Sequence, residues 1–126
     1  MLDHVCVNVT DFDPARRFYA GALEPLGIEP LLEFPNMCGF GDRGKPYLWI
    51  AERGEPSTPV HLALESPDRE TVDAFHRAAI AAGGRDNGEP GVRSIYHPNY
   101  YGAFALDPDG NNIEAVCHLP ADSDRN

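Results

Sequence analysis

The sequence repeats itself at a distance of 57 residues, and this repeat restricts the possible fold more than any other feature. The matching pairs are His4 and His61, Asp11 and Asp68, Phe18 and Phe75, and Gly27 and Gly84. A single long repeat indicates one supersecondary unit written twice. We therefore expect one domain over residues 1–120, with modules of about residues 1–56 and 57–120. Residues 121–126 are expected to form a disordered tail.

Each module is predicted to contain a short alternating strand, a helix and three further strands. The first helix is signalled by Asp13-Pro14 and ends at Gly27, and the second opens at Ser66-Pro67-Asp68 and ends at Gly83-Gly84. The predicted later strands are Ile28–Phe34, Asn36–Gly41 and Tyr47–Glu52, then Arg85–Gly88, Tyr100–Leu106 and Asn111–His118. The prediction is an α+β fold in which two βαβββ modules form a curved mixed sheet around a cleft.

Strand alternation places His4, His61 and Glu114 on the face of the sheet that the helices leave open. The apolar residues expected to face the helices are Val5, Val7, Val9, Leu62, Leu64, Ile113, Ala115 and Cys117. Two imidazoles and one carboxylate are the ligand set of mononuclear sites for divalent metals. Taken singly, each histidine is more typical of a hydrogen-bonded strand residue, and Glu114 of a solvated one. Their shared face favours a metal site.

Four motifs resemble those of the vicinal oxygen chelate superfamily, over nearly the whole chain. They are His4-Val5-x-x-Asn8-Val9-x-Asp11, Arg17-Phe18-Tyr19, His61-Leu62-Ala63-Leu64 and Asp107-Pro108-Asp109-Gly110-Asn111-Asn112-Ile113-Glu114. The superfamily includes glyoxalase I, bleomycin-resistance proteins, fosfomycin-modifying thiol transferases and extradiol dioxygenases. The resemblance implies paired βαβββ modules and a metal in their cleft. It also implies catalysis in which two neighbouring oxygens of the substrate chelate that metal.

One departure narrows the choice within the superfamily. Glyoxalase I has a fourth ligand, a glutamate, in the last strand of its first module, and Trp49 occupies that position here. The resemblance therefore implies a metal-dependent enzyme of small-molecule metabolism that is dioxygenase-like, or lyase- or isomerase-like. The alternatives are a metal-free ligand-binding or drug-sequestering protein of the bleomycin-resistance kind and a fosfomycin-type thiol transferase. The ligand set accepts iron, manganese, nickel, cobalt or zinc.

His97 and Tyr101 are the candidates for proton transfer. An imidazole that titrates near neutrality suits acid–base work, and a phenol can hydrogen-bond a substrate oxygen. The alternative reading makes His97-Pro98 a surface turn and Tyr101 a packed strand aromatic.

Charge and cysteine content limit the partners and the location. Ten basic and twenty acidic side chains give a formal charge of −10, which disfavours binding to nucleic acid. No apolar run reaches the roughly 20 residues that span a membrane. The three separated cysteines, Cys6, Cys38 and Cys117, favour a reducing cytoplasm. Small relatives often form homodimers, and the sequence leaves open whether one chain or two supply the ligands.

Overall fold

The computed structural model describes residues 1–55 and 57–121 of the 126-residue chain, so most of the predicted tail lies outside the described residues. Module one comprises β1 (Val5–Val9), α1 (Phe12–Leu23), a short 3-10 helix η1 (Glu24–Leu26), β2 (Glu29–Phe34), β3 (Met37–Asp42) and β4 (Lys45–Glu52). Module two comprises β5 (His61–Glu65), α2 (Arg69–Ala81), β6 (Arg85–Val92), β7 (Tyr101–Leu106) and β8 (Asn112–Cys117). No described helix is long and apolar enough to cross a membrane.

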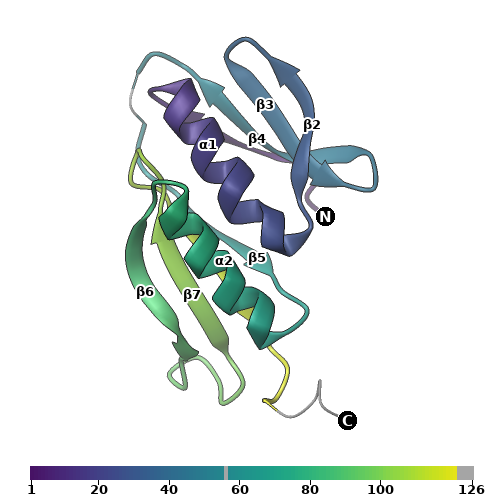
Figure 1. The fold of residues 1–126 in the computed structure, drawn as a ribbon, viewed down its shortest axis with the longest axis vertical. Coiled ribbons are helices and arrows are strands. Elements are labelled where there is room, and N and C mark those ends of the chain that lie inside the picture. The colour runs from purple at the N-terminus through teal and green to yellow at the C-terminus, as the bar shows by residue number, and fades with distance from the viewer. Residues whose placement is uncertain (56, 122–126) are drawn as a thin grey trace.

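The described strands form two four-stranded mixed sheets, with orders β1-β4-β3-β2 and β5-β8-β7-β6 (Figure 1). In each sheet the first and last strands of the module pair in parallel, and the remaining pairs are antiparallel. The α+β architecture of two βαβββ modules is thus confirmed. Strands β1 and β5 each have one edge that is unpaired among the described residues.

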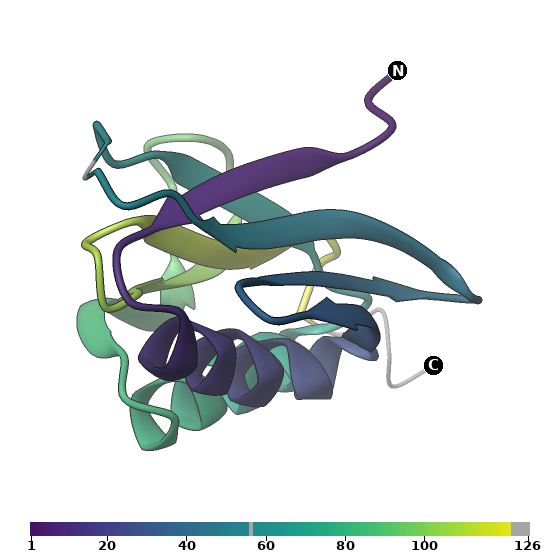
Figure 2. The ribbon, with the colours of Figure 1, turned by 90° about the horizontal axis from the view of Figure 1, so that it is seen from above.

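The two helices lie side by side on one side of the molecule, and both sheets lie on the other (Figures 1 and 2). Apolar side chains at helical spacing, among them Phe18 and Phe75, are fully buried between helices and sheets. Gly21 of α1 permits the close helix contact, because a Cβ at this position would lie 2.6 Å from Cβ of Ala82 at the end of α2. The packing of α1 against α2 therefore joins the modules into one core.

The helix starts differ in detail from the prediction. Helix α1 begins at Phe12 with Asp11 as its N-cap, so the prediction that Asp13-Pro14 caps it is wrong. Helix α2 opens after Ser66-Pro67-Asp68 as expected, with Asp68 as its N-cap, whose side chain accepts a hydrogen bond from the backbone N–H of Thr71. Strand β6 extends to Val92, beyond the predicted Gly88, because its pairing with β7 tolerates register shifts at its glycines.

The turn between β7 and β8 ties module two to module one. The Asp107 carboxylate is fully buried and accepts hydrogen bonds from the backbone N–H groups of Asp109 and Asn111 and from Nδ2 of Asn111. Its fourth donor is the hydroxyl of Tyr19 in α1, at 2.6 Å. Burial, and then the charge of Asp107, raise the pKa of Tyr19 well above the ordinary value of a tyrosine. This turn therefore fixes the start of β8, which carries Glu114.

Candidate functional site

His61 and Glu114 meet on the open face of the second sheet. Strands β5 and β8 run parallel with Ala63 opposite Glu114 and His61 opposite Asn112, so the imidazole lies beside the carboxylate. The distance from Nε2 of His61 to Oε1 of Glu114 is 2.7 Å. The His61 side chain is 54% exposed, whereas that of Glu114 is only 1% exposed. The accessible imidazole therefore covers a deeply buried carboxylate.

Tyr100 holds the other oxygen of this carboxylate. Its hydroxyl donates a hydrogen bond to Oε2 of Glu114. Burial, followed by the hydrogen bond and charge of Glu114, raises the pKa of Tyr100 to about 12, so the phenol stays protonated at neutral pH. The absence of a side chain at Gly102 leaves room for both groups, since a Cβ there would lie 3.2 Å from Oε2 of Glu114. The two oxygens are therefore held by one imidazole and one phenol.

The sequence reasoning did not single out Tyr100, although strand alternation contains a signal for it. In β7 the buried Ala103 and Ala105 face the core, and Phe104 pairs with Glu114 in the neighbouring strand. Tyr100 has the same parity as Phe104 and hence the same open face. The alternation thus points to Tyr100 as the tyrosine beside the carboxylate.

Tyr101 and His97, the two residues predicted for proton transfer, lie apart from the carboxylate. The Tyr101 hydroxyl bonds to Asp73 of α2 at 2.6 Å, so this side chain is on the helix-covered face of the sheet. His97 pairs with His118, with 2.9 Å between Nε2 and Nδ1, and its ring centroid is 5.5 Å from that of Tyr100. Only His97 is therefore connected to the His61–Glu114 side of the sheet, through the ring of Tyr100.

The environment of Glu114 fits a metal ligand. Within the described ranges its one ion-pair partner is His61, and neither a lysine nor an arginine neutralises it. An anionic oxygen buried this deeply is costly without a compensating cation, and an imidazole nitrogen together with a carboxylate oxygen is a donor pair that divalent ions favour. Among residues 1–55 and 57–121, however, no three His, Cys, Asp or Glu side chains are grouped so that they could hold a metal. Within the described part of one chain, His61 and Glu114 are therefore a pair of potential donors without a third.

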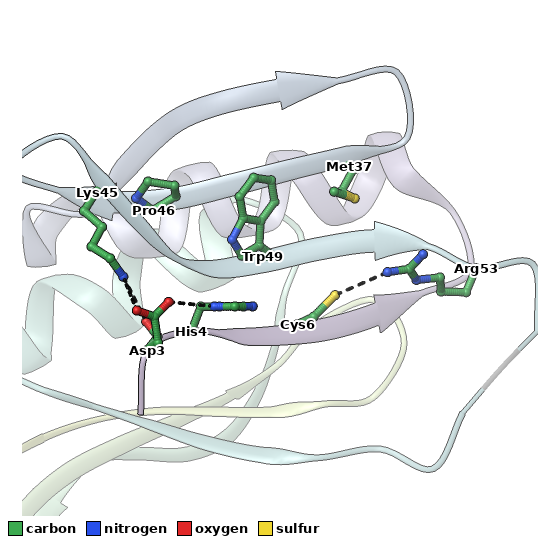
Figure 3. A pocket seen from close by; sticks show the side chains of 8 residues that line it. All are labelled: Asp3, His4, Cys6, Met37, Lys45, Pro46, Trp49 and Arg53. Carbon is green, nitrogen blue, oxygen red and sulfur yellow. Dashed lines mark hydrogen bonds and ion pairs between the residues drawn. The ribbon is translucent and has the colours of Figure 1, made fainter. Parts of the chain in front are cut away.

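His4 lies in the other module, at the start of β1 (Figure 3). Its Nδ1 is 2.8 Å from Oδ1 of Asp3, and its side chain is 57% exposed. When Nδ1 carries the shared proton, Nε2 keeps a free lone pair directed elsewhere. The N-terminal end of the chain projects beyond the sheets (Figure 2). The structure thus brings His61 and Glu114 together and leaves the accessible His4 outside that pair, in a pocket that it lines together with Leu62–Leu64 of β5.

Trp49 stands in module one at the point where Glu114 stands in module two. Trp49 pairs with Cys6 of β1, and Glu114 pairs with Ala63 of β5, which is the repeat equivalent of Cys6. The open face of module one therefore carries an indole in place of a carboxylate at this position.

Comparison with known proteins identifies similar chains. The family model of the Glyoxalase/Bleomycin resistance protein/Dioxygenase superfamily matches residues 1–115. A search of the curated proteins returns no match. Among solved structures, a glyoxalase/bleomycin resistance protein from Albidiferax ferrireducens T118 is 31% identical, with a TM-score of 0.81 over 94% of this chain and 98% of that one.

Two further solved structures share the fold at lower identity. A glyoxalase/bleomycin resistance protein/dioxygenase family enzyme from Burkholderia phytofirmans PsJN is 24% identical, with a TM-score of 0.72 over 93% of this chain and 98% of that one. A lactoylglutathione lyase from Agrobacterium tumefaciens is 19% identical, with a TM-score of 0.68 over 93% and 92% of the two chains.

Proposed function

This chain belongs to the Glyoxalase/Bleomycin resistance protein/Dioxygenase superfamily, and on that premise we propose that it is a metal-dependent enzyme for small molecules with two neighbouring oxygens. The observation that carries the proposal is the buried Glu114 carboxylate, whose ion-pair partner in the described chain is the accessible His61. A divalent ion of iron, manganese, nickel, cobalt or zinc, when bound, supplies Lewis-acid polarisation of the substrate oxygens. The expected reaction is dioxygenase-like, or lyase- or isomerase-like.

The proposed third ligand is His4, contributed by a second copy of the chain. Support comes from the separation of the donors, since His61 and Glu114 lie in module two and His4 lies at the exposed start of module one. A twofold-symmetric dimer brings the same surface of each copy against the other, so each His4 reaches the partner's pair and two equivalent sites form. The unpaired edges of β1 and β5 are available for such an association.

In this site the remaining residues orient the ligands. An Nδ1 proton donated to Asp3 leaves the free lone pair of His4 on Nε2. Tyr100 fixes one oxygen of Glu114 and leaves the other beside His61. His97, which packs on Tyr100, is the proposed proton-transfer group, and Tyr100 rather than Tyr101 lies next to the carboxylate.

Metal content tests the proposal. Protein purified without a tag and dialysed is expected to retain about one divalent ion per chain, and Glu114→Gln and His61→Ala are expected to lose it. Glu65→Gln is the matched control, because Glu65 is an exposed carboxylate in the same strand as His61. Tyr100→Phe should weaken metal affinity by about 10- to 100-fold, as loss of a ligand's hydrogen-bond partner does. Unchanged metal content in Glu114→Gln would refute the site.

Mixing two defective variants tests the contribution of a second copy. A dimer of one His4→Ala chain and one His61→Ala chain has one intact site and one doubly damaged site. Random pairing of equal amounts then restores about a quarter of the wild-type metal content. Ligands from a single chain predict no restoration at any mixing ratio, provided that each variant alone binds no metal.

A second candidate function is metal-free ligand sequestration. It is favoured by the pocket over Trp49, which module one forms by itself and which needs no metal. Tight uptake of a ligand without turnover, by protein that retains no metal, would select this alternative over the enzyme.

A further inference from the structure

The open face of module one carries a pocket of about 440 Å³ whose lining is charged at both ends and apolar in the middle (Figure 3). His4, Asp3 and Lys45 lie at one end, Cys6 and Arg53 lie at the other, and Trp49 lies between them. All of these residues belong to module one, so one chain forms the whole pocket. The pocket is distinct from the His61–Glu114 surface, which lies on module two.

The Trp49 indole is a fixed apolar wall. A Cβ at Gly39 would lie 2.8 Å from two ring atoms of Trp49, so the indole packs directly on the backbone of β3. The Phe34 ring extends this surface, with 6.4 Å between centroids and 22° between ring planes. Met37 adds a further apolar side chain to the lining. This wall suits a flat, apolar molecule, because aromatic and thioether surfaces stack well on planar groups.

Lys45 and Arg53, the two cations of the pocket, differ in whether a carboxylate already pairs with them. Lys45 lies 3.1 Å from Oδ2 of Asp3 and is thus paired. Nη2 of Arg53 is 3.9 Å from Sγ of Cys6, which is a weak acceptor, and in the described part of the chain Arg53 forms no ion pair. Arg53 is thus a guanidinium beside the apolar wall that no described carboxylate pairs with.

We propose that this pocket binds planar organic acids, with the flat body on Trp49 and Met37 and the carboxylate on Arg53. The planar fork of the guanidinium matches a carboxylate through two parallel hydrogen bonds. With the carboxylate on Arg53, the opposite end of the acid faces His4, so its role as a substrate of the proposed metal site rests on that function. Binding of the acid itself requires only module one.

The test uses full-length, metal-free protein and two probes of the same shape, 2-naphthoate and its uncharged analogue 2-naphthamide. Trp49 is the only tryptophan of the chain, so quenching of its fluorescence reports this pocket alone. We expect naphthoate to bind at least about tenfold more tightly than the amide. In Arg53→Gln this preference should vanish, while the amide binds as before. In Arg77→Gln, which removes an exposed arginine of α2, the preference should remain.

A second readout uses Cys6, the exposed cysteine of the three, since Cys38 and Cys117 are buried. At a naphthoate concentration that saturates the wild type but not Arg53→Gln, naphthoate should slow the reaction of Cys6 with an uncharged disulfide reagent only in the wild type. Equal affinity for acid and amide, or a preference that survives Arg53→Gln, would overturn the inference. Metal analysis of the same proteins, purified and dialysed without removal of metal, separates the two proposals. A wild-type protein that retains metal but does not prefer the acid refutes this proposal alone, and a wild-type protein that prefers the acid but retains no metal refutes only the metal site.

Discussion

Replacement of Tyr19 by phenylalanine tests how the two modules are joined. The Tyr19 hydroxyl donates to the Asp107 carboxylate at 2.6 Å, and both side chains are fully buried. The substitution deletes one oxygen and leaves the ring, whose edge-on contact with Phe18 has a centroid distance of 5.0 Å. The change therefore isolates one charge-assisted hydrogen bond between α1 and the β7–β8 turn.

The expected loss follows from the chemistry of the acceptor. Asp107 keeps three donors, so the carboxylate is not left bare, but it loses one bond to a buried charge. Such bonds contribute about 1.5–3 kcal/mol to the free energy of unfolding. For a chain of this size that corresponds to a fall in Tm of about 5–15 °C. Urea denaturation at fixed protein concentration, followed by circular dichroism, measures the free energy directly.

Tyr47→Phe is the matched control. It removes the same atom from a hydroxyl that bonds to the exposed Asp42 at 2.9 Å. Surface changes of this kind alter stability by less than about 0.5 kcal/mol. Equal losses for the two variants, or a loss below about 0.5 kcal/mol for Tyr19→Phe, would refute the role assigned to the buried turn.

Three further perturbations address other parts of the fold. Burial, and then the bond to Asp73, raise the pKa of Tyr101 to about 12. Because unfolded tyrosine ionises near pH 10, this residue's contribution to stability is complete below pH 10 and is lost as the pH rises to about 12. Urea midpoints of Tyr101→Phe between these values should fall less steeply than those of the wild type, and identical slopes would contradict the shift. Asp68→Ala should lower the free energy of unfolding, measured by thermal unfolding, by about 1 kcal/mol, and Asp11→Ala should lower it clearly less. Of these two N-cap residues, only Asp68 accepts a hydrogen bond through its side chain, and equal losses would contradict this difference. Gly21→Ala should lower Tm despite the better helix propensity of alanine, since the added methyl meets α2 at 2.6 Å, and a raised Tm would mean that the helices can separate at little cost.

The fold was predictable because its determinants are local and repeated. The alternation of Val5, Val7 and Val9 indicated a strand with one covered face, and Val7 and Val9 are indeed buried. The Asp-Gly turn before β8 and the glycine at the end of η1 marked element boundaries correctly. The start of α1 was harder to place, since Asp11 and Asp13 are both plausible caps and tertiary packing of Phe12 decides between them.

The candidate site was predictable only in part. Parity alone placed His61 and Glu114 on one face, and the structure has them in contact. The position of His4 depends on how whole modules are arranged, which strand parity does not encode. Tyr100 precedes β7 by one residue: alternation indicates its face, but its contact with Glu114 also depends on the space left by Gly102.

The equivalence of Trp49 and Glu114 shows that the duplicated halves have diverged into unequal partners. A chain assembled from two copies of module one would present an indole twice and the buried carboxylate nowhere. Two copies of module two would supply carboxylates and imidazoles but lose the apolar wall and its arginine. Neither half alone therefore presents both the buried carboxylate and the indole.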